Sequence, residues 1–351
     1  MKMRNWRKIS LLLAALCISL AATAQLDKGI EYYFNKDYAN AVKCFAQAAE
    51  QGDVDAQCIL GLCYFSGLGV AQNYNESVKW ISKAAEQNSI ESKYYLGYFY
   101  DNGIGVAKNS REAVKWYYRA AEQGNAKAQY QLGASYANGD GVEQNDKEAV
   151  MWYSKAAEQG LADAQNNLGG CYYTGQGVAQ DYGEAVYWFR KSAEQGFALA
   201  QYNLGACYAK GQGLAKNTCE AAKWYRKAAE QGYAPAQNIL ATLYANGDGV
   251  EEDYSKAVEW YRKAAEQGNV NAEFHLGGCY FKGRGVAQNS HEAARWFHKA
   301  AEQGDEDAQY LLGVFYEYGE GVEKDLYRAM YWYKKAADQG IVEAAEALKK
   351  F

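Results

Sequence analysis

The sequence repeats itself with a period of 36 residues. The pentapeptide Ala-Ala-Glu-Gln-Gly ends at Gly52, and close copies of it end at Asn88, Gly124, Gly160, Gly196, Gly232, Gly268, Gly304 and Gly340. A fixed period of this length is typical of solenoids, in which each unit packs only against its neighbours. The period therefore predicts one array of eight units over residues 53–340, without a central core.

Each unit has the pattern of two amphipathic helices. In the unit that begins at Asn125, apolar residues recur at helical spacing from Ala128 to Tyr136 and again from Ala149 to Ala157. Two loop glycines between these segments, present in every unit, predict a helix end and a tight turn. An Asn or Asp follows, and Glu lies three residues later in six units, which predicts the N-cap of the second helix.

Two further positions of the unit indicate close packing. Gly133 lies inside the first helix, where Ala would be about 1 kcal/mol more favourable, yet seven of the eight units have Gly there and only Ala241 differs. A closely crossing helix would explain this glycine. Trp152 has an equivalent in every unit, and we interpret these eight tryptophans as a packing ladder between repeats rather than a site.

These residues resemble a known family. The unit A-Q-x-x-L-G-x-x-Y-x-x-G-x-G-V-x-x-[DN]-x-x-[KE]-A-x-x-W-Y-x-K-A-A-E-Q-G closely resembles the Sel1-like repeat, a relative of the tetratricopeptide repeat, from Asp53 to Gly340. The resemblance implies an all-α fold, a right-handed α-solenoid of helix-turn-helix repeats that forms a tetratricopeptide-like superhelix.

The two ends of the array depart from the unit. Residues 25–52 resemble an ordinary tetratricopeptide repeat, because Tyr32 and Ala41 are nine residues apart rather than thirteen. We expect this segment to be an N-terminal capping unit. Residues 341–351 begin another unit with Ala344 and Leu348 but do not complete it, and we expect a C-terminal capping helix there.

The first 24 residues have the order of a secretory signal peptide. Basic residues from Lys2 to Lys8 precede an apolar run from Ile9 to Leu20, and small residues follow up to Ala24. The run is shorter than the ~20 residues that a membrane-spanning helix needs, and no later segment is apolar enough to span a bilayer. We expect residues 1–24 to be removed and the mature protein to be exported, either periplasmic or secreted.

The charge balance disfavours nucleic acid as a partner. The full chain has 37 basic and 42 acidic residues, a net charge of −5. Removal of the four basic residues within residues 1–24 leaves 33 against 42, or −9. Such a surface repels phosphate groups, so we do not expect the protein to bind nucleic acid. We also expect it to be a monomer.

The cysteines do not form a regular disulfide framework. Seven remain after residue 24, an odd number, and four of them (Cys63, Cys171, Cys207 and Cys279) share one apolar position of the unit. A single bridge from Cys44 to Cys58 or Cys63 stays open.

Catalytic and metal-binding patterns are absent from the sequence. It contains no S-x-x-K, S-D-N, K-T-G or G-x-S-x-G motif. His275, His291 and His298 all lie in the seventh unit, and the last two share a helical face, but we interpret them as surface residues rather than metal ligands. We therefore expect a protein that is not an enzyme and that needs no cofactor or metal.

The candidate binding site is a strip on the first helices. If these helices line the inner face, as in tetratricopeptide solenoids, positions 6, 10 and 13 of each unit point into a groove and are often aromatic. Tyr and Phe offer large contact areas at a low entropy cost, which suits recognition of a protein or peptide. The alternative is that the rings only pack against neighbouring helices. The candidate residues on this concave face are Tyr94, Tyr98, Asp101, Tyr130, Tyr173, Tyr202, Phe274, Phe281 and Tyr310.

Two functions follow as hypotheses. The first is an exported repeat scaffold that binds a protein or peptide through its concave face. The alternative is a cell-wall or β-lactam binding protein, with weak or no hydrolase activity, like the cysteine-rich Sel1 group that the chain also resembles. That group has paired cysteines that bridge its helices, and this sequence lacks them. A purely structural role is a third possibility.

Overall fold

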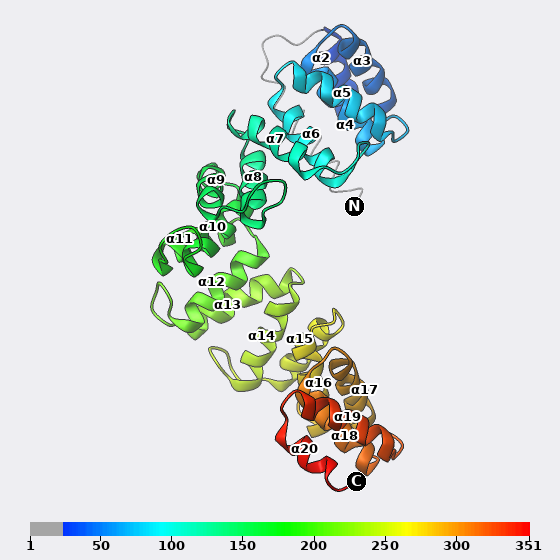
Figure 1. Ribbon diagram of the computed structural model, residues 1–351, viewed down its shortest axis with the longest axis vertical. Helices are drawn as coiled ribbons and strands as arrows, with labels where there is room; N and C mark the ends of the chain where they lie inside the picture. The colour runs from blue at the N-terminus through cyan, green and yellow to red at the C-terminus, as the bar shows by residue number, and fades with distance from the viewer. Residues whose placement is uncertain (1–23) are drawn as a thin grey trace. The chain divides into compact units, whose positions relative to one another are not determined.

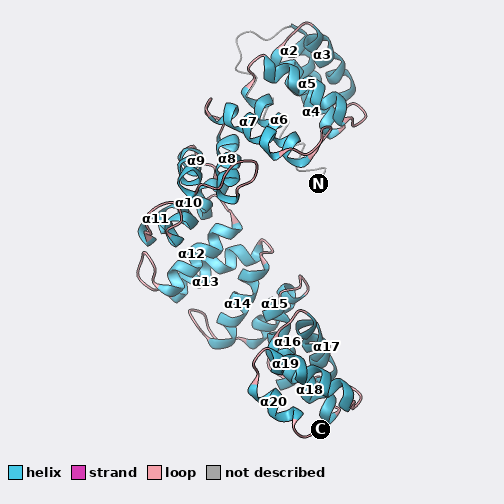
Figure 2. Ribbon diagram, viewed as in Figure 1, coloured by secondary structure: helices cyan, strands magenta, loops and turns pink. Residues whose placement is uncertain are grey.

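The computed structural model describes residues 24–351, and over these residues the chain forms only helices, turns and loops (Figure 2). The predicted signal peptide, apart from Ala24, lies outside the described residues. Contacts between residues divide the chain after Gln180 into two units, and each is described by itself (Figure 1). Within residues 24–351, no helix combines the length and apolar character needed to cross a membrane.

The first of these two units, which ends at Gln180 and contains several repeats, includes the helices up to residue 174. They are α2 (Ala24–Phe34), α3 (Tyr38–Glu50), α4 (Val54–Ser66), α5 (Tyr74–Glu86), α6 (Ile90–Asn102), α7 (Ser110–Ala121), α8 (Ala126–Asn138), α9 (Asp146–Glu158) and α10 (Ala162–Thr174).

The second unit begins at residue 181. Its helices are α11 (Tyr182–Glu194), α12 (Ala198–Lys210), α13 (Thr218–Glu230), α14 (Ala234–Asn246), α15 (Tyr254–Ala265), α16 (Val270–Lys282), α17 (Ser290–Glu302), α18 (Glu306–Tyr318), α19 (Leu326–Asp338) and α20 (Val342–Leu348).

Within each unit, every helix packs against the helix before it and the helix after it. The all-α fold of helix-turn-helix repeats predicted from the sequence is therefore confirmed. In the repeat that begins at Asn125, for example, the first helix is α8 and the second is α9, and Figure 1 shows the two side by side.

The loop between the two helices has the geometry that its glycines predict. Gly139 ends α8 with φ of 77°, in the left-handed region that favours glycine. Gly141 also has φ of 77°, and a Cβ there would lie 2.3 Å from the carbonyl oxygen of Ser110 in the preceding repeat. Asn145 then caps α9, since its Oδ1 accepts hydrogen bonds from the amides of Lys147 and Glu148.

The glycine inside the first helix makes room for an aromatic ring. A Cβ on Gly133 would lie 2.7 Å from Cδ1 of Tyr153, a buried residue of α9. Gly97 has the same relation to Tyr117, and Gly313 to Tyr333. The expected close approach is thus present, but a side chain of the second helix makes it.

The tryptophans have two kinds of contact. Trp152 of α9 is buried, and its ring centroid lies 5.9 Å from that of Tyr118 in the preceding repeat, as expected for packing between repeats. Its other neighbour is Lys155, whose Nζ lies 3.9 Å from the ring centroid, and Lys227 covers Trp224 at the same distance. Basic side chains therefore cover these tryptophan rings, and the neighbouring Tyr153, which packs against Gly133, is the ring that we call the core ring of the second helix.

A ladder of glutamines links consecutive repeats. Gln129 of α8 donates through Nε2 to the carbonyl oxygen of Ala121 in the preceding repeat over 3.1 Å. Its Oε1 accepts from Gln159, at the end of α9, over 2.7 Å. The same two bonds recur at Gln57, Gln201, Gln237 and Gln309, and we call these residues the glutamine ladder.

Two repeats replace the ladder glutamine with a charged residue. Lys93 donates to Gln123 over 3.0 Å and to Asn88. Glu273, which is 3% exposed, accepts a 2.7 Å bond from Gln303. Burial raises the pKa of the Glu273 carboxyl, and the Gln303 bond and the Lys299 charge oppose this effect only in part.

The cysteines after residue 24 are all free thiols in the structure, so Cys44 is bonded to neither Cys58 nor Cys63. Burial raises the pKa of Cys58 and of Cys63 to about 12. These two side chains behave as small core residues.

Candidate functional site

The predicted site residues of the first unit lie on three of its first helices. Tyr94, Tyr98 and Asp101 are on α6, Tyr130 is on α8 and Tyr173 is on α10. Tyr94 is buried, and its ring centroid lies 6.1 Å from that of Tyr117 in α7. Burial raises the pKa of Tyr94 to about 12. Tyr94 is therefore a core residue, whereas the other four are half-buried.

The same packing recurs at position 6 of four other repeats. Tyr130 lies 5.9 Å from Tyr153, Tyr202 lies 5.5 Å from Tyr225, Phe274 lies 5.7 Å from Phe297, and Tyr310 lies 5.8 Å from Tyr333, all between ring centroids. In each case the partner is the core ring of the second helix of the same repeat. Packing thus accounts for one side of each ring, and the half-buried rings keep an exposed part.

Rings at position 13 meet a ring on the first helix of the next repeat. The ring of Tyr98 lies 6.4 Å from that of Phe65, and the ring of Phe281 lies 5.3 Å from that of Phe315. Asp101 is half-buried at position 13, and burial raises the pKa of its carboxyl. The aromatic surface of the first helices is thus continuous from one repeat to the next at two places, between α4 and α6 and between α16 and α18.

In the second unit this surface opens into a hollow of about 470 Å³. Its lining comes mainly from α16, with further residues from α14, α15, α17 and α18, and its apolar side chains include Ala245, Phe274, Phe281 and Leu311. We call this space the apolar hollow. It brings together two of the predicted site residues, Phe274 and Phe281, and none of the other seven lines it.

Gly278 provides the space for this hollow. A Cβ on Gly278 would meet no atom within 4 Å, whereas a Cβ on the adjacent Gly277 would lie 2.8 Å from the ring of Phe297. The two neighbouring glycines thus serve different purposes. One permits helix packing, and the other leaves the surface open.

The basic side chains of the apolar hollow come from the repeat that begins at Asn269, and Thr242 and Asn246 of the preceding repeat also line it. Lys282 ends α16 and Arg284 follows it in the loop, and both are exposed. Arg284 donates through Nη1 to the hydroxyl of Tyr254 over 3.2 Å. The ring of His275 lies 5.1 Å from that of Tyr261, and partial burial lowers its pKa, so the imidazole is neutral at pH 7.

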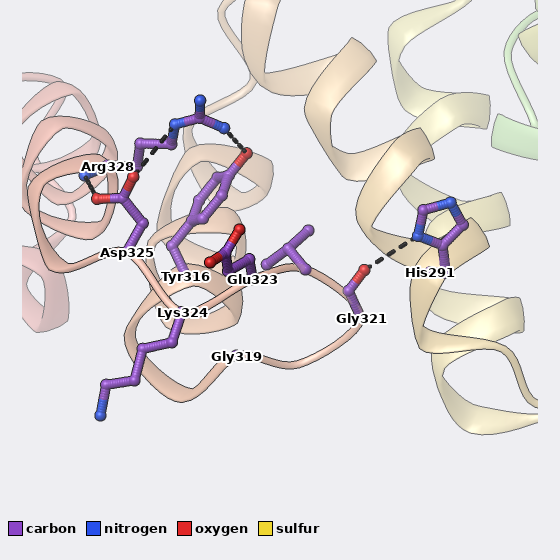
Figure 3. A pocket seen from close by; sticks show the side chains of 9 residues that line it. His291, Tyr316, Gly319, Gly321, Glu323, Lys324, Asp325 and Arg328 are labelled. Atoms are coloured by element: carbon purple, nitrogen blue, oxygen red, sulfur yellow. Dashed lines mark hydrogen bonds and ion pairs between the residues drawn. The ribbon is translucent and has the colours of Figure 1, made fainter.

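A second, polar hollow of about 720 Å³ lies beside the glycine loop of the last complete repeat (Figure 3). Its polar groups already bond to one another. His291 Nδ1 lies 3.1 Å from the carbonyl oxygen of Gly321, and Arg328 contacts both Asp325 and the hydroxyl of Tyr316. Figure 3 shows Lys324 pointing away from this group. Helix capping and loop packing account for the arrangement.

The histidines do not converge. His291 bonds to the loop, while His298 lies 3.6 Å from Glu302 with its ring against Trp332. Among residues 24–351, no three or more His, Cys, Asp or Glu side chains gather in a way that could hold a metal ion.

These repeats match a family model. The model of the Sel1 repeat matches nine consecutive segments that together run over residues 24–341. The chain belongs to the Sel1 repeat family. The first matched segment, residues 24–53, contains residues 25–52, which were predicted to form a tetratricopeptide-like cap.

Solved structures of Sel1 repeat proteins resemble this chain. A protective antigen of uropathogenic Escherichia coli with an SLR fold is 39% identical over 88% of this chain, with a TM-score of 0.82. The match covers 66% of that protein, so this chain spans slightly less than two thirds of its length. A Sel1 repeat protein from Oxalobacter formigenes is 32% identical over 96% of this chain and 98% of its own, with a TM-score of 0.67. A comparison with curated proteins found no match.

The Sel1 repeat is a scaffold suited to protein–protein interaction. In this member, sequence reasoning located the first-helix strip but missed Gly278, Lys282 and Arg284. The pair Gly277-Gly278 was the available signal, since only one of two adjacent helical glycines is needed for packing.

Proposed function

We propose that this Sel1 repeat protein is an exported scaffold that binds a protein or peptide through the face made by its first helices. The observation that carries the proposal is the run of half-buried aromatic side chains on these helices, which opens into the apolar hollow. Exposed aromatic surface of this kind provides much of the binding energy at protein interfaces.

Export rests on the order of residues 1–24, which is that of a signal peptide. Fractionation of cells that express the full chain, and of cells that express residues 25–351, tests this part. Equal distribution of the two forms between the cytoplasm and the exported fractions would contradict export.

Crosslinking in the native cells, followed by affinity purification and mass spectrometry, tests the binding face. The test variant combines Tyr98→Ser with Tyr173→Ser on first helices. The matched control combines Tyr118→Ser with Tyr187→Ser on second helices, where the two residues are 45% and 47% exposed. We expect the test variant alone to lose its partner while its helical content stays unchanged. Retention by the test variant, or equal loss from both, would refute the proposed face.

A further inference from the structure

The apolar hollow has basic but no acidic side chains in its lining, although the chain as a whole is acidic. The chain carries a net charge of −5, with 42 acidic residues. None of the described residues that line the hollow is an aspartate or glutamate, whereas Lys282 and Arg284 both line it. Lys282 forms no ion pair with any described residue, and Arg284 donates to the neutral hydroxyl of Tyr254, whose ring it also covers. The cationic side of the hollow is therefore available to an anion.

Comparison of the repeats shows that only the repeat that begins at Asn269 has both these basic residues and this apolar lining. Position 16, between the two loop glycines, is Arg284 here and a neutral or acidic residue elsewhere, namely Leu68, Ile104, Asp140, Gln176, Gln212, Asp248 and Glu320. Only this repeat combines Phe at positions 6 and 13 with Gly at position 10. Packing of the array does not require these choices, since the other repeats pack without them.

The dimensions and lining of the hollow restrict what can occupy it. A volume of about 470 Å³ lies within the range of roughly 300–1,000 Å³ that is usual for ligand pockets. Phe274, Phe281, Phe297 and Leu311 offer contact to a large apolar side chain. A neutral His275 beside them adds a hydrogen-bonding group without a charge. An occupant that suits all of these groups has an apolar part next to a negative charge.

We propose that the apolar hollow binds a peptide segment of the partner protein in which an aromatic or large aliphatic side chain is flanked by Asp or Glu. The apolar side chain fills the space above Gly278, and the flanking carboxylate pairs with Lys282 and Arg284. This inference rests on the proposed function and specifies the chemistry of the partner. Charge complementarity of this type selects partners and speeds their association.

Selection from a randomised dodecapeptide library displayed on phage tests the proposal. The expected result on the wild-type protein is enrichment of peptides with an aromatic or large aliphatic residue within two positions of Asp or Glu. Gly278→Leu fills the space without a clash at Cβ, and we expect at least a tenfold loss of affinity for these peptides. The unfolding midpoint of this variant should be equal to or above that of the wild type.

A charge-reversal variant, Lys282→Glu with Arg284→Glu, provides a readout that a folding defect cannot imitate. We expect selection on this variant to enrich basic flanks in place of acidic ones. Enrichment without acidic residues, affinity that is unaffected by Gly278→Leu, or no enrichment at all would overturn the proposal. If the selected peptides instead bind more weakly to the Tyr98→Ser, Tyr173→Ser variant, the apolar hollow is not their site, but the proposed function is still supported. The proposed function itself is refuted only by the crosslinking test.

Discussion

Two adjacent glycines of α16 respond in opposite ways to an added methyl group. Gly277→Ala places a Cβ 2.8 Å from the Phe297 ring, and overpacking of this kind costs about 1–3 kcal/mol. Gly278→Ala meets nothing within 4 Å and gains about 1 kcal/mol of helix propensity. Denaturant unfolding of the two single variants measures the expected loss of stability in Gly277→Ala and the expected gain in Gly278→Ala. A loss of stability in both variants would show that the hollow is closed in solution.

Glu273 replaces a glutamine of the glutamine ladder and makes the stability of that contact between repeats depend on pH. Because burial raises its pKa in the folded state, its contribution to stability is full below the ordinary value of 4.5 and is lost as pH rises through the folded pKa. Glu273→Gln restores an amide that can donate to a carbonyl, as Gln237 does. We expect it to match wild-type stability below pH 4.5 and to exceed it by about 1 kcal/mol at pH 7.

Thermal unfolding from pH 4 to pH 8 measures this difference. The reciprocal variant Gln309→Glu is the control, because it places a carboxyl at the equivalent ladder position of the next repeat. It should acquire the pH dependence that Glu273→Gln loses. If the difference in stability between Glu273→Gln and the wild type were the same at every pH, the raised pKa of Glu273 would not be the cause of that difference.

At the scale of single helices, the caps are unequal between repeats. Asn145 caps α9 through two backbone amides, whereas Leu161 precedes α10 and provides no side-chain bond. Asn145→Ala should cost about 1 kcal/mol, and Leu161→Asn should recover up to a similar amount. Hydrogen exchange of the first-turn amides reports each change locally. Unchanged protection at Lys147 and Glu148 in Asn145→Ala would show that this cap is dispensable.

The helices and their caps could be predicted from the sequence because both depend on residues a few positions apart. The requirement for Gly133 was also visible, but its partner Tyr153 was not, since contact depends on the rotation of α9 against α8. The glutamine ladder was missed because Gln129 and Gln159 are 30 residues apart and both are polar. The apolar hollow required side chains from three consecutive repeats, which no single unit of the pattern contains.

At the scale of the whole molecule, the repeat contacts imply that one repeat can be removed without loss of the fold. Gln129 donates to Ala121, and Gln165 donates in the same way to Ala157, one repeat later. Deletion of residues 125–160 would bring Gln165 to the carbonyl of Ala121 and join Gly124 to Leu161 in register. Since each repeat packs only on its neighbours, the shortened chain should keep its helical content per residue.

Deletion of residues 125–142 is the matched control, because it removes one helix and leaves α9 without its partner α8. Circular dichroism and thermal unfolding compare the two deletions. We expect cooperative unfolding for the full-repeat deletion, and reduced helicity with exposed apolar surface for the half-repeat deletion, because Tyr153 then loses the Gly133 surface that buries it. Equal helicity and equal melting of the two would mean that the repeat is not the unit of packing in this chain.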